Sequence, residues 1–110
     1  MLNAINRFRE QNGIKPISYT DRLVDDYCTL HCLEMAKRHD IYHAPSHYLD
    51  GWAEAVAMMQ YCDNWKDEVI FKILGASDGH RDILLNSDSI SYASYMDNWI
   101  VYVTIRGRRR

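Results

Sequence analysis

A chain of 110 residues has room for one domain built around a single core. Apolar residues make up 47% of it and charged residues 25%, which is the balance of a globular protein and excludes a disordered chain. The formal net charge is −2, and the longest apolar runs are too short to span a membrane.

Basic residues are concentrated at the C-terminus. Without the last three arginines, ten basic residues stand against fifteen acidic ones, so residues 1–107 carry a net charge of −5. A nucleic-acid-binding domain normally carries a basic stripe on its fold, so we expect no nucleic-acid partner. We assign one domain to residues 1–107 and a basic tail to residues 108–110, and we interpret Arg106 as part of the same tail charge.

The first two predicted helices differ in length. Apolar residues at a three-residue spacing predict a short helix that ends at Asn12-Gly13. Thr20 is the expected cap of a longer helix that ends near Arg38. We expect the wide apolar stripe of this second helix to support the core. The stripe consists of Leu23, Val24, Tyr27, Cys28, Leu30, His31 and Met35.

The second helix also carries a histidine and two cysteines. His31 lies within the apolar stripe, so we predict a packed, hydrogen-bonded histidine and not a ligand. Cys28 and Cys32 lie one helical turn apart, where their parallel side chains suit a disulfide poorly. The chain has no Cys-x-x-Cys spacing for zinc, so we expect buried free thiols, while a bridge from one of them to Cys62 stays open.

The middle of the chain is less regular. Residues 39–51 lose the helical periodicity, which predicts a loop that carries His43 and His47. In residues 52–59, the alanines and methionines favour a helix, whereas the alternation would suit a half-buried strand. Apolar spacing predicts a third helix over residues 64–75.

A short helix is predicted over residues 77–86. Ser77 or Asp78 can cap its first backbone N–H groups, and Asn86 can take the left-handed conformation that ends many helices. His80 lies in the first turn, where the positive end of the helix dipole disfavours an imidazolium. We therefore expect His80 to stay neutral, the form that binds a metal or accepts a proton.

The last predicted element is a β-hairpin. Two runs rich in aromatic and β-branched residues, 90–96 and 99–105, are joined by Asp97-Asn98. We expect the aromatic side chains on these strands to pack into the core, although they could also form a partner surface.

Several segments match, in their order and spacing, the motifs of one known family. They are residues 3–13 with Lys15-Pro16-Ile17, then His31 to Ala36, Ile41-Tyr42-His43, Ala53-Glu54-Ala55-Val56-Ala57, and Gly79-His80-Arg81-Asp82-Ile83-Leu84. On these segments the chain resembles the CAP superfamily of cysteine-rich secretory proteins, antigen 5 and pathogenesis-related proteins, also called SCP-like. The resemblance is greatest to short bacterial members and runs nearly end to end.

The resemblance implies a fold and a location. The family fold is α+β, a three-layer α-β-α sandwich with a small antiparallel sheet, in which residues 52–58 form a strand. The family also implies an extracellular, secreted protein, although the chain shows no signal peptide.

The resemblance further implies a site. It would bring His43, Glu54 and His80 together in one cleft as the family's site residues. The surroundings of that site differ from the family pattern. Ala53 and Ala55 replace a glycine and an asparagine beside Glu54, and Thr104 stands where the last strand usually has glutamine, so the groups around the site are altered.

Such a site allows two kinds of chemistry. His43 and His80, with the Glu54 carboxylate, can hold a divalent metal such as Zn²⁺ and leave one coordination position open for water. The same groups could equally serve as catalytic residues, with a general base and electrostatic support.

Three functional hypotheses are consistent with the sequence. The first is a binding module that takes a small apolar molecule, a peptide or a glycan against a cleft lined by Tyr42, His43, Tyr48 and Trp52. The alternative is a metal-assisted hydrolase or peptidase that uses His43, Glu54 and His80. A structural or partner-binding domain inside the cell is the third.

Overall fold

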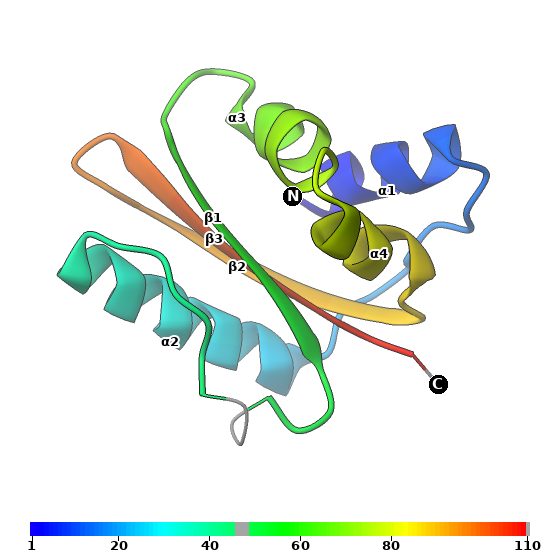
Figure 1. Ribbon diagram of the computed structural model, residues 1–110, viewed down its shortest axis with the longest axis horizontal. Coiled ribbons are helices and arrows are strands. Elements are labelled where there is room, and N and C mark those ends of the chain that lie inside the picture. The colour runs from blue at the N-terminus through cyan, green and yellow to red at the C-terminus, as the bar shows by residue number, and fades with distance from the viewer. Residues whose placement is uncertain (46–48, 110) are drawn as a thin grey trace.

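The computed structural model describes residues 1–45 and 49–109, which form an α+β domain with helices on both faces of a three-stranded antiparallel sheet (Figure 1). The predicted α+β class and small antiparallel sheet are confirmed, and of residues 52–58, which the family resemblance places in a strand, all but Trp52 lie in a strand. The elements are α1 (Leu2–Gln11), α2 (Arg22–Arg38), β1 (Ala53–Gln60), α3 (Trp65–Glu68), η2 (Val69–Leu74), α4 (Asp78–Asn86), β2 (Ser89–Asp97) and β3 (Ile100–Arg108).

Strand β3 is the centre of the sheet, with the strand order β1-β3-β2. It forms the predicted hairpin with β2, in which Asp97 pairs with Ile100. The turn is therefore Asn98-Trp99 and not Asp97-Asn98. Asn98 and Trp99 both have a positive φ, 51° and 67°, as the right-handed twist of a two-residue hairpin requires.

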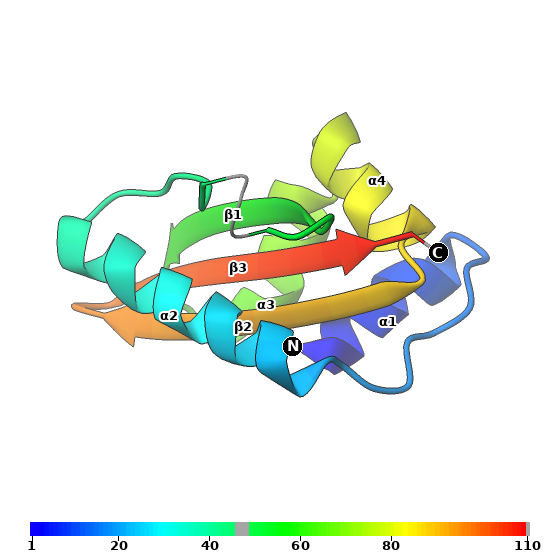
Figure 2. The ribbon, with the colours of Figure 1, turned by 90° about the horizontal axis from the view of Figure 1, so that it is seen from below.

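The two faces of the sheet pack against different helices. Helices α1, η2 and α4 cover one face, where α1 packs against η2 and α4, and η2 and α4 contact β1. Helix α2 lies on the other face and packs against β2 and β3 (Figure 2). Side chains alternate along each strand, so each strand supplies residues to both core clusters.

The prediction of a single wide stripe on α2 is wrong. Val24, Cys28, His31 and Met35 face the sheet and are buried. Leu23, Tyr27 and Leu30 remain 62%, 49% and 59% exposed, because they lie on the flank of the helix that turns away from the sheet. The chain therefore leaves an apolar surface on α2.

The ends of α2 also differ in detail from the prediction. The N-cap is Asp21, whose carboxylate accepts a hydrogen bond from the Val24 N–H at 3.1 Å, while the Thr20 hydroxyl donates to Asp25 instead. At the C-terminus His39 has a left-handed conformation, with φ 54°, a position that usually favours glycine.

Helix α4 ends without the predicted left-handed asparagine. Asn86 stays helical, and the next residue, Ser87, is extended with φ −83°. The physical reason is Arg9 of α1, whose guanidinium donates to the carbonyls of Leu84 at 2.7 Å and Ser87 at 3.2 Å. Because a side chain from α1 satisfies these terminal carbonyls, the helix needs no left-handed cap.

Helix 64–75 is present but is not one regular helix. A short α-helical turn, α3, continues as the π-helical η2, and the Gly75 N–H bonds to the Ile70 carbonyl at 2.7 Å. A Cβ on Gly75 would lie 2.7 Å from the Phe8 ring, so this close approach to α1 requires glycine. Among the described residues, no helix is both long and apolar enough to cross a membrane.

The C-terminal arginines do not all belong to a tail. Arg106 is buried inside β3, and Arg108 is the last residue of that strand. The interpretation of Arg106 as tail charge is therefore wrong. Arg109 follows the strand and bonds to Asp82 of α4.

Candidate functional site

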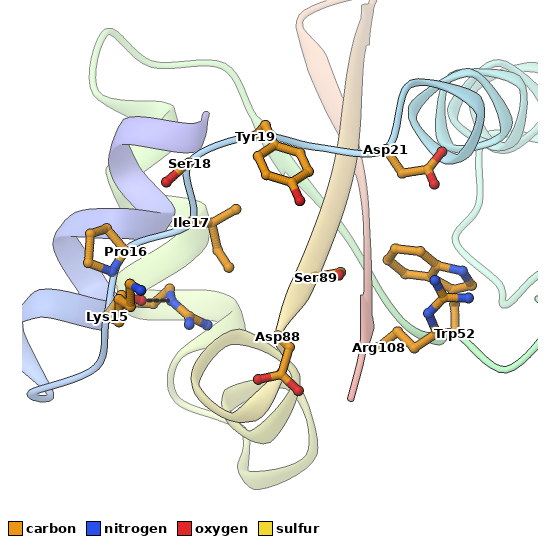
Figure 3. A pocket seen from close by; sticks show the side chains of 11 residues that line it. Lys15, Pro16, Ile17, Ser18, Tyr19, Asp21, Trp52, Asp88, Ser89 and Arg108 are labelled. Carbon is orange, nitrogen blue, oxygen red and sulfur yellow. Dashed lines mark hydrogen bonds between the residues drawn. The ribbon is translucent and has the colours of Figure 1, made fainter. Parts of the chain in front are cut away.

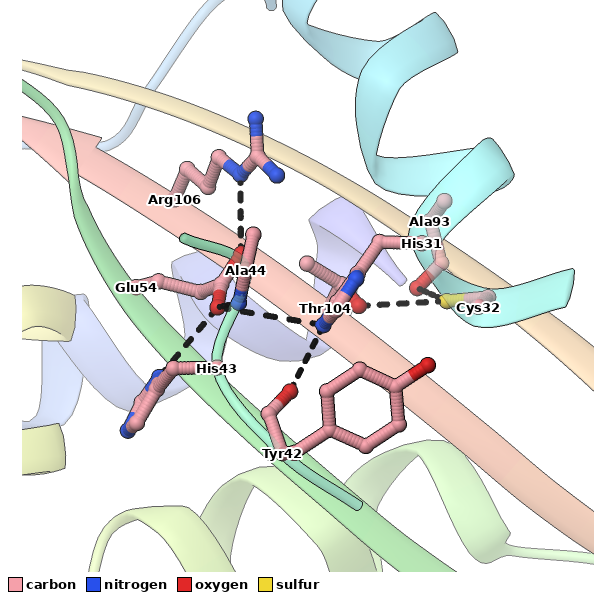
Figure 4. Close-up of polar contacts among 9 residues, drawn as sticks. All are labelled: His31, Cys32, Tyr42, His43, Ala44, Glu54, Ala93, Thr104 and Arg106. Carbon is pink, nitrogen blue, oxygen red and sulfur yellow. Dashed lines mark hydrogen bonds and ion pairs between the residues drawn. The ribbon is translucent and has the colours of Figure 1, made fainter. Parts of the chain in front are cut away.

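Glu54 is the centre of a buried polar cluster on the α2 face of the sheet (Figure 4). Its side chain is fully buried. One carboxylate oxygen, Oε1, accepts from the Ala44 backbone N–H at 2.8 Å and from His43 Nδ1 at 3.2 Å. The other, Oε2, accepts from Arg106 Nε at 3.0 Å, across the register pair that joins β1 and β3. Both oxygens of the carboxylate are therefore engaged.

His43 connects this cluster to the surface. Its ring is 60% exposed, and Nδ1 lies against the Glu54 carboxylate. Since a carboxylate only accepts hydrogen bonds, Nδ1 carries the proton and Nε2 of the neutral ring is left as an acceptor. Figure 4 shows Nε2 on the side of the ring that faces away from Glu54. The predicted contact between His43 and Glu54 is formed.

His80 lies on α4, near His43 but outside the Glu54 cluster. Partial burial lowers its pKa, and the positive charge that His43 can carry lowers the pKa further. The sequence analysis expected a neutral His80 because of the helix dipole, whereas the structure gives burial and the neighbouring His43 as the causes of the lowered pKa. The structure thus brings His43 and Glu54 into contact, and places His80 where it interacts electrostatically with His43.

His31 is the packed histidine that the sequence predicts. It is buried, and its Nε2 donates to the Tyr42 carbonyl at 2.7 Å, while its ring meets the Tyr42 ring edge-on. The same nitrogen lies 3.9 Å from Glu54 Oε1. This closeness was not predictable from local sequence, because it depends on how residues 42–44 fold against β1.

The three cysteines are free, and Cys28 and Cys32 are buried, as predicted. Burial raises the pKa of Cys28 to about 12 and that of Cys32 to about 11. The Cys32 thiol donates to Thr104 Oγ1 at 3.3 Å. Because both thiols stay protonated at neutral pH, they belong to the core and not to a nucleophilic site.

Of the predicted ligand-binding aromatic residues, Tyr42 and Trp52 share neither of the two cavities described below. Tyr42 contacts His31 and lies beneath the Arg38 guanidinium. Trp52 is buried, with the Arg108 guanidinium 4.7 Å from its ring, at a separate cavity of about 640 Å³ beside loop 15–19 (Figure 3). Tyr48 lies outside the described residues.

A second cavity, which we call the α2 groove, adjoins the Glu54 cluster. It measures about 650 Å³ and lies between α2, residues 44–45 and the end of β3. Its floor includes His31 and Arg106, and its rim Glu34 and Asp50. Its apolar wall consists of Leu23, Tyr27, Leu30, Ala44 and Pro45. The sequence signal for it was the excess width of the apolar stripe on α2, which we expected to be core.

The described residues do not fit a metal centre with three protein ligands. They contain no group of three or more His, Cys, Asp or Glu side chains that could hold a metal ion. The Glu54 oxygens are already engaged by Ala44, His43 and Arg106. The zinc expected at His43 and His80 stays a prediction, and we derive no step through a metal.

The chain was compared with protein-family models and with curated proteins. Neither the protein-family models nor the curated proteins searched give a match to the chain. The resemblance to the CAP superfamily therefore depends on short segments of the sequence.

Proposed function

We propose that this chain is a CAP-like domain that binds a small apolar ligand in the α2 groove. The observation that carries the proposal is the groove itself, a cavity of about 650 Å³ with an apolar wall and a polar floor. Ligand sites in proteins typically have volumes of about 300–1,000 Å³ and combine apolar walls with a few polar groups that orient the ligand.

The exposed side chains of α2 support the same proposal. Leu23, Tyr27 and Leu30 follow one another along one flank of the helix and remain about half exposed or more. Scattered apolar residues on a surface need no explanation, but a contiguous apolar patch beside a cavity indicates a binding site. A ligand seated against these side chains would remove their apolar area from water.

The family resemblance extends the proposal to the fold and the location. Helices on both faces of the sheet support an α-β-α sandwich of the CAP type. By the same resemblance, we propose that the protein is secreted and acts outside the cell.

Binding of an apolar fluorescent probe tests the proposal, with Leu30→Asn as the disruptive variant. Leu33→Asn is the matched control, because Leu33 is also an exposed leucine of α2, at 40%, but does not line the groove. We expect Leu30→Asn to weaken probe binding about tenfold or more, and Leu33→Asn to leave it unchanged. Equal binding by both variants and the original chain would exclude the groove as the site.

A second candidate function, hydrolysis, is favoured by one observation. The buried Glu54 carboxylate holds His43 Nδ1, so the exposed Nε2 has the orientation of a general base that could take a proton from water. In this proposal Glu54 positions His43, and neutral His80 lies nearby as a second acceptor. His43→Gln and His80→Ala should each abolish cleavage of a peptide or ester without unfolding the protein. Unchanged turnover in both would refute the assignment.

The metal-assisted form of this alternative has its own test. Elemental analysis of protein purified without chelators or metal columns would measure any bound zinc. Zinc that is retained by the original chain and lost in His43→Ala would support His43 as a ligand. Protein without bound metal would leave His43 and His80 as a pair of titratable imidazoles.

A further inference from the structure

Arg106 at the floor of the α2 groove uses only part of its hydrogen-bonding capacity. The residue is 4% exposed, and its Nε donates to Glu54. Among the described residues, only Glu54 accepts a hydrogen bond from Arg106, and it does so from Nε, so no described group pairs with the two terminal amino groups. Figure 4 draws a contact from Arg106 Nε to Glu54 and none from either terminal amino group.

These amino groups open on the groove. Arg106 lines the groove, and no side-chain nitrogen of the described residues is fully sealed from solvent without a hydrogen-bond partner. Water in the groove can solvate these N–H groups, so a ligand that displaces the water without offering an acceptor leaves them unpaired, whereas a ligand that accepts hydrogen bonds from them gains affinity. The polar end of a ligand would therefore lie against Arg106, and its apolar body against α2.

The surrounding charges favour an acceptor without charge. Arg106 and Glu54 already form a neutral pair, and His31 uses its Nε2–H on the Tyr42 carbonyl. The groove rim carries Glu34 and Asp50, of which Glu34 lies 4.0 Å from Arg38 on the same helix. A carboxylate would add negative charge beside these acids, whereas a carbonyl oxygen can accept from Arg106 at no such cost.

We propose that the α2 groove selects an uncharged ligand with an apolar body and a carbonyl-type oxygen that accepts hydrogen bonds from the terminal amino groups of Arg106. The proposal rests on the proposed binding function and adds the chemical class of the ligand.

A series of naphthalene probes with one shared body tests this selection. The ketone 6-propionyl-2-(dimethylamino)naphthalene is uncharged, carries a carbonyl oxygen, and shifts its emission in apolar surroundings. The 6-carboxylate analogue adds a charge, and 2-(dimethylamino)naphthalene lacks the acceptor. We expect the ketone to bind about tenfold more tightly than either analogue, as a hydrogen bond to a charged donor implies.

Arg106→Lys tests the residue itself, because an ammonium keeps the charge opposite Glu54 but loses the forked amino groups. In this variant the affinity of the ketone should fall to that of 2-(dimethylamino)naphthalene, whose own affinity should stay the same. Arg109→Lys, at an exposed residue just after β3, is the control and should change neither affinity. If Arg106→Lys does not fold, the ranking of the three probes on the original chain still decides the proposal.

The outcomes separate the two proposals. No binding of any probe would overturn the binding function itself. Equal binding of all three would keep the groove as an apolar site and overturn the role of Arg106. Tightest binding of the carboxylate would also overturn the proposal, because it would make Arg106 part of an anion site.

Discussion

The two faces of the sheet are built from the same strands but differ in chemistry. The face under α1, η2 and α4 packs an apolar cluster that includes Ile90 and Ile105. The face under α2 carries a row of polar residues, in which Glu54, Arg106 and Ser91 pair across the three strands. Apolar packing stabilises both faces, but the second face also retains buried polar groups and an open groove.

The difference follows from how completely each face is covered. Helix α2 packs on β2 and β3, whereas at β1 the segment that carries His43 and Ala44 covers the same face. Buried charges stabilise a fold less than apolar groups of similar volume do. The polar row of the α2 face therefore contributes less to stability than apolar residues of similar volume would, and under the proposed function it serves binding.

The largest effect is expected from breaking the buried ion pair. Glu54→Ala would leave the Arg106 guanidinium buried without its partner, so the free energy of unfolding should fall by about 3–5 kcal/mol. Urea denaturation measures this free energy of unfolding. The double variant E54L/R106M should recover most of this loss, because apolar residues replace both charges. If the double variant were as unstable as Glu54→Ala, the polar row would be needed for stability, contrary to the comparison.

On the opposite face, an apolar truncation should lower stability without affecting binding. Leu84 of α4 is fully buried in the apolar cluster, so Leu84→Ala should cost about 2–5 kcal/mol of unfolding free energy. Probe affinity in the α2 groove should stay unchanged in the folded fraction. Weaker probe binding in folded Leu84→Ala would mean that the two faces are coupled.

The pH dependence of stability tests the environment of His80, which lies on α4 and interacts electrostatically with His43. Its pKa is lowered from 6.5 in the folded protein, so the unfolded chain binds the proton more readily, and stability falls as the pH drops below 6.5. Urea denaturation at about pH 7.5 and about pH 5.5 should show a smaller difference in His80→Gln than in the original chain. In an NMR titration, His43→Gln should raise the pKa of His80, and an unchanged pKa would mean that the two imidazoles do not interact.

The smallest effect is a gain of stability at the end of α2. His39 has a left-handed conformation that glycine adopts without strain, so His39→Gly should raise the free energy of unfolding by about 0.5–1 kcal/mol. His39→Ala, which keeps the Cβ, should show no such gain in the same urea experiment. A loss in His39→Gly would show that the imidazole itself contributes there.

Local patterns predicted the helices and the hairpin well. The C-terminal hairpin and the helix that carries His80 have strong signals in neighbouring residues. Strand β1 was ambiguous from its own residues, and the family resemblance resolved it. Details such as the end of α4 depend on Arg9, a residue distant in sequence, and so could not be read from the helix itself.

The site was predicted only in part, for the same reason. The contact between His43 and Glu54 followed from the order of motifs. The contact between Arg106 and Glu54 did not, because the charge of Arg106 resembled that of the neighbouring tail, and only the pairing of β1 with β3 places Arg106 opposite Glu54. The α2 groove was not predicted, because the sequence of one helix does not distinguish apolar residues that are buried from those that stay exposed.

Mapping the bound naphthyl ketone by NMR is the most direct test of a binding face on α2. Amide resonances are compared with and without the probe. We expect the largest shifts near Leu23, Tyr27, Leu30 and Arg106, with α1 and α4 unchanged. Shifts confined to α1 and α4, or centred on the separate cavity at Trp52, would contradict the account.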